Sequence, residues 1–139
     1  MTTRTTSTLA LGLALLRLVV GIIFIAHGAQ KIFVYGVPAV IGSFGQMGIP
    51  VPALTAPLVA WLELVGGAAL AAGLFTPFFG VALAIEMVGA ILLVHLKGGF
   101  FLPNGMEHAL AMFGAAAALA LTGPGSLSLD RLRARGGCP

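Results

Sequence analysis

The sequence predicts an all-α integral membrane protein, a bundle of four transmembrane helices. Two features of its composition indicate this class, because 59% of the 139 residues are hydrophobic and only 8% are charged. A soluble domain carries about 25% charged residues, so this chain has too few to cover a water-exposed surface. The third observation is that its apolar residues fall into four runs suited to a hydrocarbon layer of about 30 Å. The length fits one domain over residues 1–139.

The first helix is expected over Leu9–Phe33, after the polar start MTTRTTST. A cleaved signal peptide fits poorly, since Arg17 interrupts the apolar run and no A-x-A site follows at the right distance. The stretch LLRLVVGIIFIAHGAQK also carries His27 and Lys31. A charged side chain near the middle of a membrane costs roughly 2.5–3.5 kcal/mol on insertion scales. We therefore expect Arg17 to face protein or water, beside a partner.

Residues 34–55 are dense in Gly and Pro but carry no charge, so neither a spanning helix nor a solvated loop fits them. We expect a short interfacial helix or a re-entrant cap over the mouth of the bundle. Three further spanning helices are expected at about 56–74, 78–96 and 106–122. Pro57 suits the first turn of the second helix, and Gly123–Pro124 ends the fourth. Residues 123–139 then form a basic tail.

Four spans place both termini on one side of the membrane. The basic residues that flank the spans on that side are Arg4, Arg131, Arg133 and Arg135, against Lys31 and Lys97 on the other. The positive-inside rule then puts both termini in the cytoplasm. We interpret the net charge of +3 as membrane orientation and expect no nucleic-acid partner. The single cysteine, Cys138, lies in the tail and cannot form an internal disulfide.

Buried charges point to a first candidate site. Counting depth along the expected helices at 1.5 Å per residue puts Arg17, Glu63 and Glu86 in the inner half to the middle of the membrane. A cluster of these three residues is the simplest arrangement, and it keeps one negative charge unless one carboxyl binds a proton. The cluster could carry protons, or it could be a buried ion pair that fixes helix packing.

A second polar group is expected at the outer mouth of the bundle. Its members come from the first, third and fourth helices, and they are His27, Gln30, Lys31, His95, Glu107 and His108. Side chains of these types suit the head group of a quinone, because they donate hydrogen bonds to carbonyl oxygens and relay protons. A metal site formed by His27, His95, His108 and Glu107 is a weaker alternative, since no H-x-x-x-H spacing is present. Each histidine could also simply lie at the water boundary.

The position of His95 raises a difficulty for a single pocket. Glu86 and His95 are nine residues apart, which places them on opposite sides of an ideal helix. Either the third helix unwinds before Gly98–Gly99, or His95 faces another subunit or the interface.

The chain resembles the DoxX family of small bacterial four-helix membrane proteins. The similarity rests on LLRLVVGIIFIAHGAQKIF, LELVGGAALAAGLFTPFFG, EMVGAILLVHLKGGFF, and GMEHALAM with the closing GPGSLSLD, and it covers about Leu9 to Arg131. It implies the cell inner membrane and a link to sulfur or redox systems, since distant relatives are subunits of thiosulfate:quinone oxidoreductase and others are named as stress-response proteins. It implies no catalytic residue.

Three functions remain open at this point. The first is a redox-linked subunit, an oxidoreductase component that binds a quinone-type or similar small molecule in the outer pocket. The second is a non-enzymatic membrane anchor for soluble redox or stress-response proteins, whose basic tail contacts anionic lipid or the partner. The third is metal or small-solute binding at the outer histidines. The bilayer is the expected partner in each case, and small-residue helix faces permit a homo-oligomer.

Overall fold

The computed structural model describes residues 3–136, and all regular structure within this range is helical. The expected fold class, an all-α membrane bundle, is confirmed. Three helical stretches are long and apolar enough to cross a membrane, namely Ser7–Tyr35, Pro52–Ala72 and Thr76–Gly98. A shorter apolar helix, Glu107–Thr122, is the fourth member of the bundle.

Each long stretch contains more than one kind of helix. The first is formed by α1 (Thr3–Ala29), which begins four residues before Ser7, and the π-helical η1 (Gln30–Tyr35). The second consists of α3 (Pro52–Trp61), the π-helical η2 (Leu62–Gly66) and α4 (Gly67–Ala72). The third consists of α5 (Thr76–Ala90), the π-helical η3 (Ile91–His95) and the 3₁₀ turn η4 (Leu96–Gly98). The fourth helix is α6 (Glu107–Thr122).

Two segments outside these stretches are also helical. The segment expected as a cap contains α2 (Val37–Gln46). The second span begins earlier than expected, with Pro52 in the first turn and Pro57 inside α3. The tail was expected only as a polar basic stretch, but it forms α7 (Leu129–Gly136). Ser128 starts this helix, because its Oγ accepts a hydrogen bond from the Arg131 backbone N–H at 3.3 Å.

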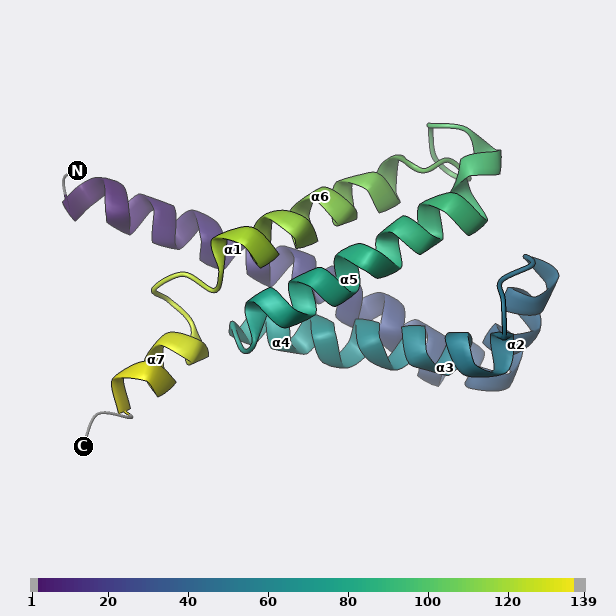
Figure 1. The fold of residues 1–139 in the computed structure, drawn as a ribbon, viewed down its shortest axis with the longest axis horizontal. Helices are drawn as coiled ribbons and strands as arrows, with labels where there is room; N and C mark the ends of the chain where they lie inside the picture. The colour runs from purple at the N-terminus through teal and green to yellow at the C-terminus, as the bar shows by residue number, and fades with distance from the viewer. Residues whose placement is uncertain (1–2, 137–139) are drawn as a thin grey trace.

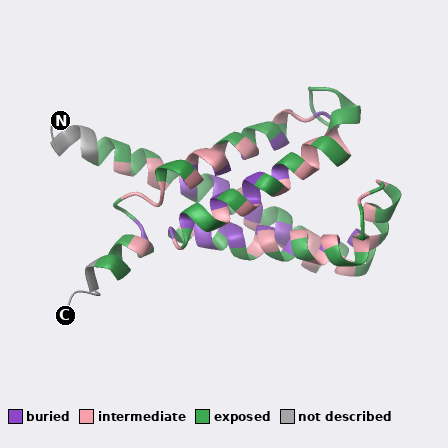
Figure 2. Cartoon of the chain, viewed as in Figure 1, coloured by how far each residue is buried: buried purple, intermediate pink, exposed green. Residues whose placement is uncertain are grey.

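The helices associate as two pairs. Helix α1 lies along η2 and α4, α5 lies along α6, and the two pairs cross in the middle of the bundle (Figure 1). The described ends of α1 and α7 lie at the same end of the bundle, as four spans require. Buried residues concentrate where the helices cross, and the outward faces are exposed (Figure 2). Large apolar side chains on those outer faces, such as Leu15 and Ile85, suit contact with lipid.

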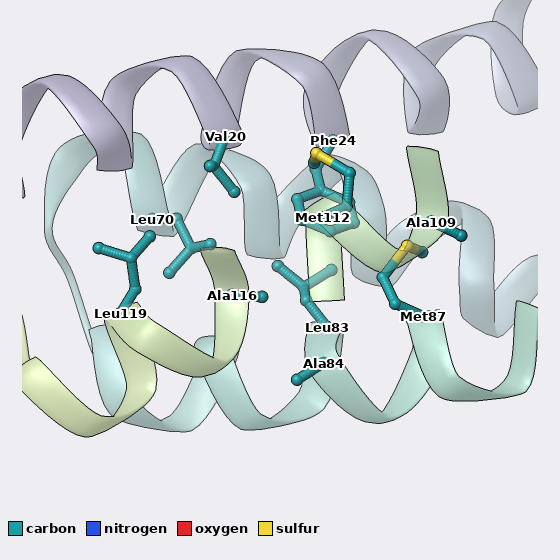
Figure 3. Packing of buried hydrophobic residues seen from close by; sticks show 10 residues of the cluster. All are labelled: Val20, Phe24, Leu70, Leu83, Ala84, Met87, Ala109, Met112, Ala116 and Leu119. Atoms are coloured by element: carbon teal, nitrogen blue, oxygen red, sulfur yellow. The ribbon is translucent and has the colours of Figure 1, made fainter. Parts of the chain in front are cut away.

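The core at the crossing draws on all four helices of the bundle. It consists of Val20 and Phe24 of α1, Leu70 of α4, Leu83, Ala84 and Met87 of α5, and Ala109, Met112, Ala116 and Leu119 of α6 (Figure 3). Alanines make up a large part of the α6 contribution. Such small side chains let helix backbones approach closely, which drives helix association where lipid removes the hydrophobic driving force.

Glycines set the spacing between α1 and the second span. A Cβ added at Gly21 would lie 2.6 Å from the Gly67 carbonyl oxygen and 2.8 Å from the Ala71 Cβ. A Cβ at Gly28 would lie 2.5 Å from the Leu64 backbone nitrogen. These contacts leave no room for a side chain and fix one antiparallel register, in which residues 21 and 28 of α1 lie opposite 67 and 64.

We expect Gly21→Ala to lower the stability of the bundle, because its methyl group must force the two backbones apart. Overpacking of this kind costs about 1–3 kcal/mol. Gly12 is the matched control, since it lies on the same helix and an added Cβ there would meet nothing within 4 Å. Thermal unfolding in detergent measures both variants. Equal melting temperatures for Gly21→Ala and Gly12→Ala would contradict the close contact.

Candidate functional site

A cavity of about 350 Å³ lies between the two helix pairs. Most of its wall is apolar, with contributions from Phe24, Phe44, Met87, Leu93 and Met112. Six titratable side chains also line it, namely His27, Lys31, Glu63, Glu86, His95 and His108. We call this cavity the polar-ended pocket. Its combination of apolar walls and a few polar groups is typical of small-molecule sites.

The π-helical turns bring much of this polar lining together. Each of the turns η1, η2 and η3 carries one titratable pocket residue, which is Lys31, Glu63 and His95 in that order. A π-helical turn is wider than an α-helical turn, so it rotates the residues that follow it about the helix axis. This explains how Glu86 and His95 line one pocket although an ideal helix would place them on opposite sides. Turns of this kind are frequent at functional sites.

Lys31 and Glu63 form a salt bridge across the first two spans. The Glu63 side chain is almost fully buried, whereas that of Lys31 is partly exposed. The carboxyl group of Glu86 interacts with that of Glu63. Glu86 Oε2 is buried and has no hydrogen-bond partner within the described part of the chain. The polar end of the pocket therefore holds one amine, two neighbouring carboxyls and one acceptor oxygen without a donor.

The three histidines of the pocket come from α1, η3 and α6. The rings of His27 and His108 lie with their centroids 5.7 Å apart, at an interplanar angle of 32°. His95 Nδ1 is 3.5 Å from the carbonyl oxygen of Asn104, in the loop that leads to α6. Imidazoles can donate, accept or transfer a proton, so the histidines give the pocket groups that can exchange protons with a ligand.

Two expected members of the outer group lie outside the pocket. Gln30 is exposed, and it does not line the cavity. Glu107 Oε1 accepts a hydrogen bond of 2.8 Å from the Leu102 backbone N–H, so this carboxylate holds the loop before α6. Over residues 3–136, no three His, Cys, Asp or Glu side chains come together as a metal site. The structure therefore does not assemble the candidate set His27, His95, His108 and Glu107.

The expected cluster of Arg17, Glu63 and Glu86 is not formed, because Arg17 lies elsewhere. Its guanidinium donates hydrogen bonds to the carbonyl oxygens of Ala71, Pro124 and Leu127. The register of α1 against the second span explains the difference, since it places residue 17 beside the end of α4 and Glu63 beside the end of α1. Glu63 and Glu86 thus line the pocket together with Lys31 and the histidines. Of the three residues in the expected cluster, Arg17 alone lies at the other end of the bundle.

Arg17 fastens the C-terminal segment to the bundle. It is 4% exposed, and it satisfies carbonyls at the ends of α4 and α6, where cations are favoured by the helix dipole. Gly73 passes directly between Arg17 and Ser128, where a Cβ would lie 2.8 Å from the guanidinium carbon, and its φ of +72° also favours glycine. Asp130 Oδ2 accepts a hydrogen bond of 3.4 Å from the Thr76 backbone N–H at the start of α5. The contacts of Arg17 and Thr76 therefore hold the segment GPGSLSLD against the bundle, and we call this set of contacts the structural lock.

Sequence reasoning missed the Lys31–Glu63 pair and the part of the cap in the pocket. Phe44, Met47 and Ile49 line the cavity from α2 and the turn after it. The glycines that set the register, Gly21 and Gly67, were a usable signal for the pair, because backbones approach closely where glycines face each other. No pattern in the cap indicates which of its apolar residues face inward.

We expect Arg17→Met to release the C-terminal segment, because three carbonyl oxygens lose their donor. The expected loss of stability is about 1–3 kcal/mol. Limited trypsin digestion at Arg131 and Arg133 measures the release directly. The control is Arg133→Met, which removes the contact of that guanidinium with the Phe75 ring at 5.0 Å. Because it also removes one cleavage site, the two variants are compared by cleavage at Arg131. Unchanged digestion of Arg17→Met would argue against the lock.

We expect Lys31→Met to destabilise the bundle by on the order of 3 kcal/mol, because it leaves the buried Glu63 carboxylate unpaired. The double variant Lys31→Met/Glu63→Met should regain much of that loss, since two apolar side chains replace the pair. Lys97→Met is the matched control, as Lys97 is exposed and lies outside the pocket. Unfolding midpoints in detergent give the values, and a double variant as unstable as the single one would refute the pairing.

Comparison with known proteins identifies the family. The DoxX family model matches residues 12–96. The chain belongs to the DoxX family. It is 38% identical over 120 residues to a Bacillus subtilis protein named "Putative oxidoreductase CatD", covering 86% of this chain and 85% of CatD. It is 39% identical to an uncharacterized membrane protein of Mycobacterium tuberculosis, covering 84% of this chain and 77% of that protein.

A third relative is the inner membrane protein YphA of Escherichia coli, which is 29% identical over 125 residues, covering 86% of this chain and 88% of YphA. The resemblance to DoxX proteins inferred from the sequence is thus confirmed. Two of these relatives are named as membrane proteins, which agrees with the expected class of protein. No solved structure matches the chain.

Proposed function

We propose that this DoxX protein is a redox-linked membrane subunit that binds a quinone-type molecule in the polar-ended pocket. The observation that carries the proposal is the pocket itself, in which the neighbouring Lys31, Glu63 and Glu86 line the same largely apolar cavity as three histidines. Ligand pockets span roughly 300–1,000 Å³, so a cavity of about 350 Å³ suits one substituted ring. An apolar tail would lie outside it, among the exposed apolar side chains.

The chemistry of the polar end suits a ligand that gains and loses protons together with electrons. A quinone takes up two electrons and two protons to become a hydroquinone, and the reverse reaction releases them. In the proposal, the neighbouring carboxyls of Glu63 and Glu86 and the imidazoles of His27 and His108 hold and pass on those protons. A soluble redox protein donates or accepts the electrons.

The comparisons support the redox part of the proposal through CatD, whose name describes an oxidoreductase. The inner membrane is the proposed location, in line with the name of YphA. Both termini are proposed to face the cytoplasm, where the exposed Arg131 and Arg133 on α7 would lie near anionic lipid head groups.

We expect the protein purified into nanodiscs to retain quinone, and His27→Ala to lose most of it, because that variant removes one polar contact and loosens the His27–His108 pair. Gln30→Ala is the matched control, since Gln30 lies three residues further along, is exposed and does not line the pocket. Chromatography of the extracted lipid gives quinone per protein, and titration with duroquinone gives the affinity.

Two results would count against the proposal. One is wild-type protein that neither retains quinone nor binds added quinone or hydroquinone, which would favour the anchor function. The other is an equal loss of binding in His27→Ala and Gln30→Ala, which would show that the effect does not come from the pocket.

A further inference from the structure

We propose that the polar-ended pocket selects the reduced, hydroxyl-bearing form of its ring ligand, through a hydrogen bond from a ligand O–H to Glu86 Oε2. This inference rests on the proposed function and goes further, because it states which redox form binds and names the atom that makes the distinction.

The first argument is the buried acceptor without a donor. Within residues 3–136, Glu86 Oε2 and Thr76 Oγ1 are the buried side-chain atoms that lack a hydrogen-bond partner, and only Glu86 lines the pocket. A buried polar atom left unpaired costs about 1–3 kcal/mol. A ligand that brings a hydrogen-bond donor to this atom removes that cost, and a ligand that brings only acceptors does not.

The second argument is the balance of charge at the polar end. Lys31 pairs with Glu63, and Glu63 interacts with Glu86. One amine and two carboxyls are neutral together only when one proton is bound between the carboxyls, where it also relieves their repulsion. Because Glu86 contacts Glu63 and its Oε2 atom has no partner, the shared proton lies between Glu63 and the other Glu86 oxygen, and Oε2 is left as an acceptor.

The third argument is that the strongest donor is already paired with a carboxylate. A quinone carbonyl needs donors, but the charge of the Lys31 ammonium group is balanced by Glu63, which weakens its attraction for a neutral carbonyl oxygen. His27 and His108 can donate or accept according to tautomer, so they suit either redox form. Glu86 Oε2 therefore decides the preference, because it would bond to a hydroxyl group but repel a carbonyl oxygen. Sites built around a ligand hydroxyl discriminate strongly against analogues that lack it.

The test compares durohydroquinone with duroquinone, two ligands with the same ring and methyl groups. Equilibrium dialysis against the protein in nanodiscs, without oxygen for the reduced form, measures both affinities. We expect the wild type to bind durohydroquinone at least about tenfold more tightly, which corresponds to about 1.4 kcal/mol.

Two variants at Glu86 test whether Oε2 is the acceptor that distinguishes the two ligands. Glu86→Leu should lose the preference for durohydroquinone, because it removes the acceptor. Glu86→Gln should keep most of it, since the amide N–H₂ can face Glu63 while the amide oxygen stays an acceptor. Glu107→Gln is the control, because Glu107 contacts the loop and not the pocket, and it should match the wild type.

The outcomes separate this inference from the function on which it rests. Equal binding of both forms by the wild type, tighter binding of duroquinone, or an unchanged preference in Glu86→Leu would overturn the selection while leaving a ring-binding pocket in place. Binding of neither form by the wild type would overturn the proposed function and this inference together.

Discussion

The close contact between α1 and the second span determines where every other polar residue lies. Gly21 against Gly67, and Gly28 against Leu64, allow only one register between the two helices. That register brings Lys31 within reach of Glu63 and puts Arg17 at the opposite end, beside the last turn of α4. Small residues thus do more than tighten the packing here, because they decide which charges meet.

The bundle consequently divides its charged groups between two regions with different chemistry. At one end, Arg17 is surrounded by backbone carbonyls, which are fixed acceptors that cannot gain or lose protons in this pH range. At the other end, Lys31 meets two carboxyls and lies in a pocket with three imidazoles, all of which exchange protons. Arg17 suits a permanent structural lock, since a guanidinium stays charged and offers several donors in a rigid fork. The buried carboxyls of Glu63 and Glu86 both line the cavity.

The sequence was sufficient to predict the membrane bundle and to single out the few charged residues inside its apolar helices, because hydropathy and rare intramembrane charges are strong signals. It was not sufficient to pair them. The expected cluster of Arg17, Glu63 and Glu86 depended on counting the depth of each residue from the expected end of its helix. The first helix was expected to start at Leu9, but α1 starts at Thr3, so its end does not mark the edge of the bundle. Nor could an ideal helix periodicity show that His95 turns into the pocket, since the π-helical turn that rotates it has no sequence signature of its own. The register between two helices and the direction of a side chain after a π-helical turn both depend on packing against neighbouring helices, which the local sequence does not show.

The π-helical turns also place a constraint on the length of the helices that carry them. A π-helical turn accommodates one residue more than a regular turn, so deleting one residue within Ile91–His95 would restore a regular α-helix without breaking it. The helix would remain apolar and long enough for the membrane, yet every side chain after the deletion would swing by about 100°. His95 would then leave the cavity, and the loop to α6 would start in a different direction. Among relatives, the number of residues between Glu86 and His95 should therefore be as informative about a shared pocket as the identities of the two residues.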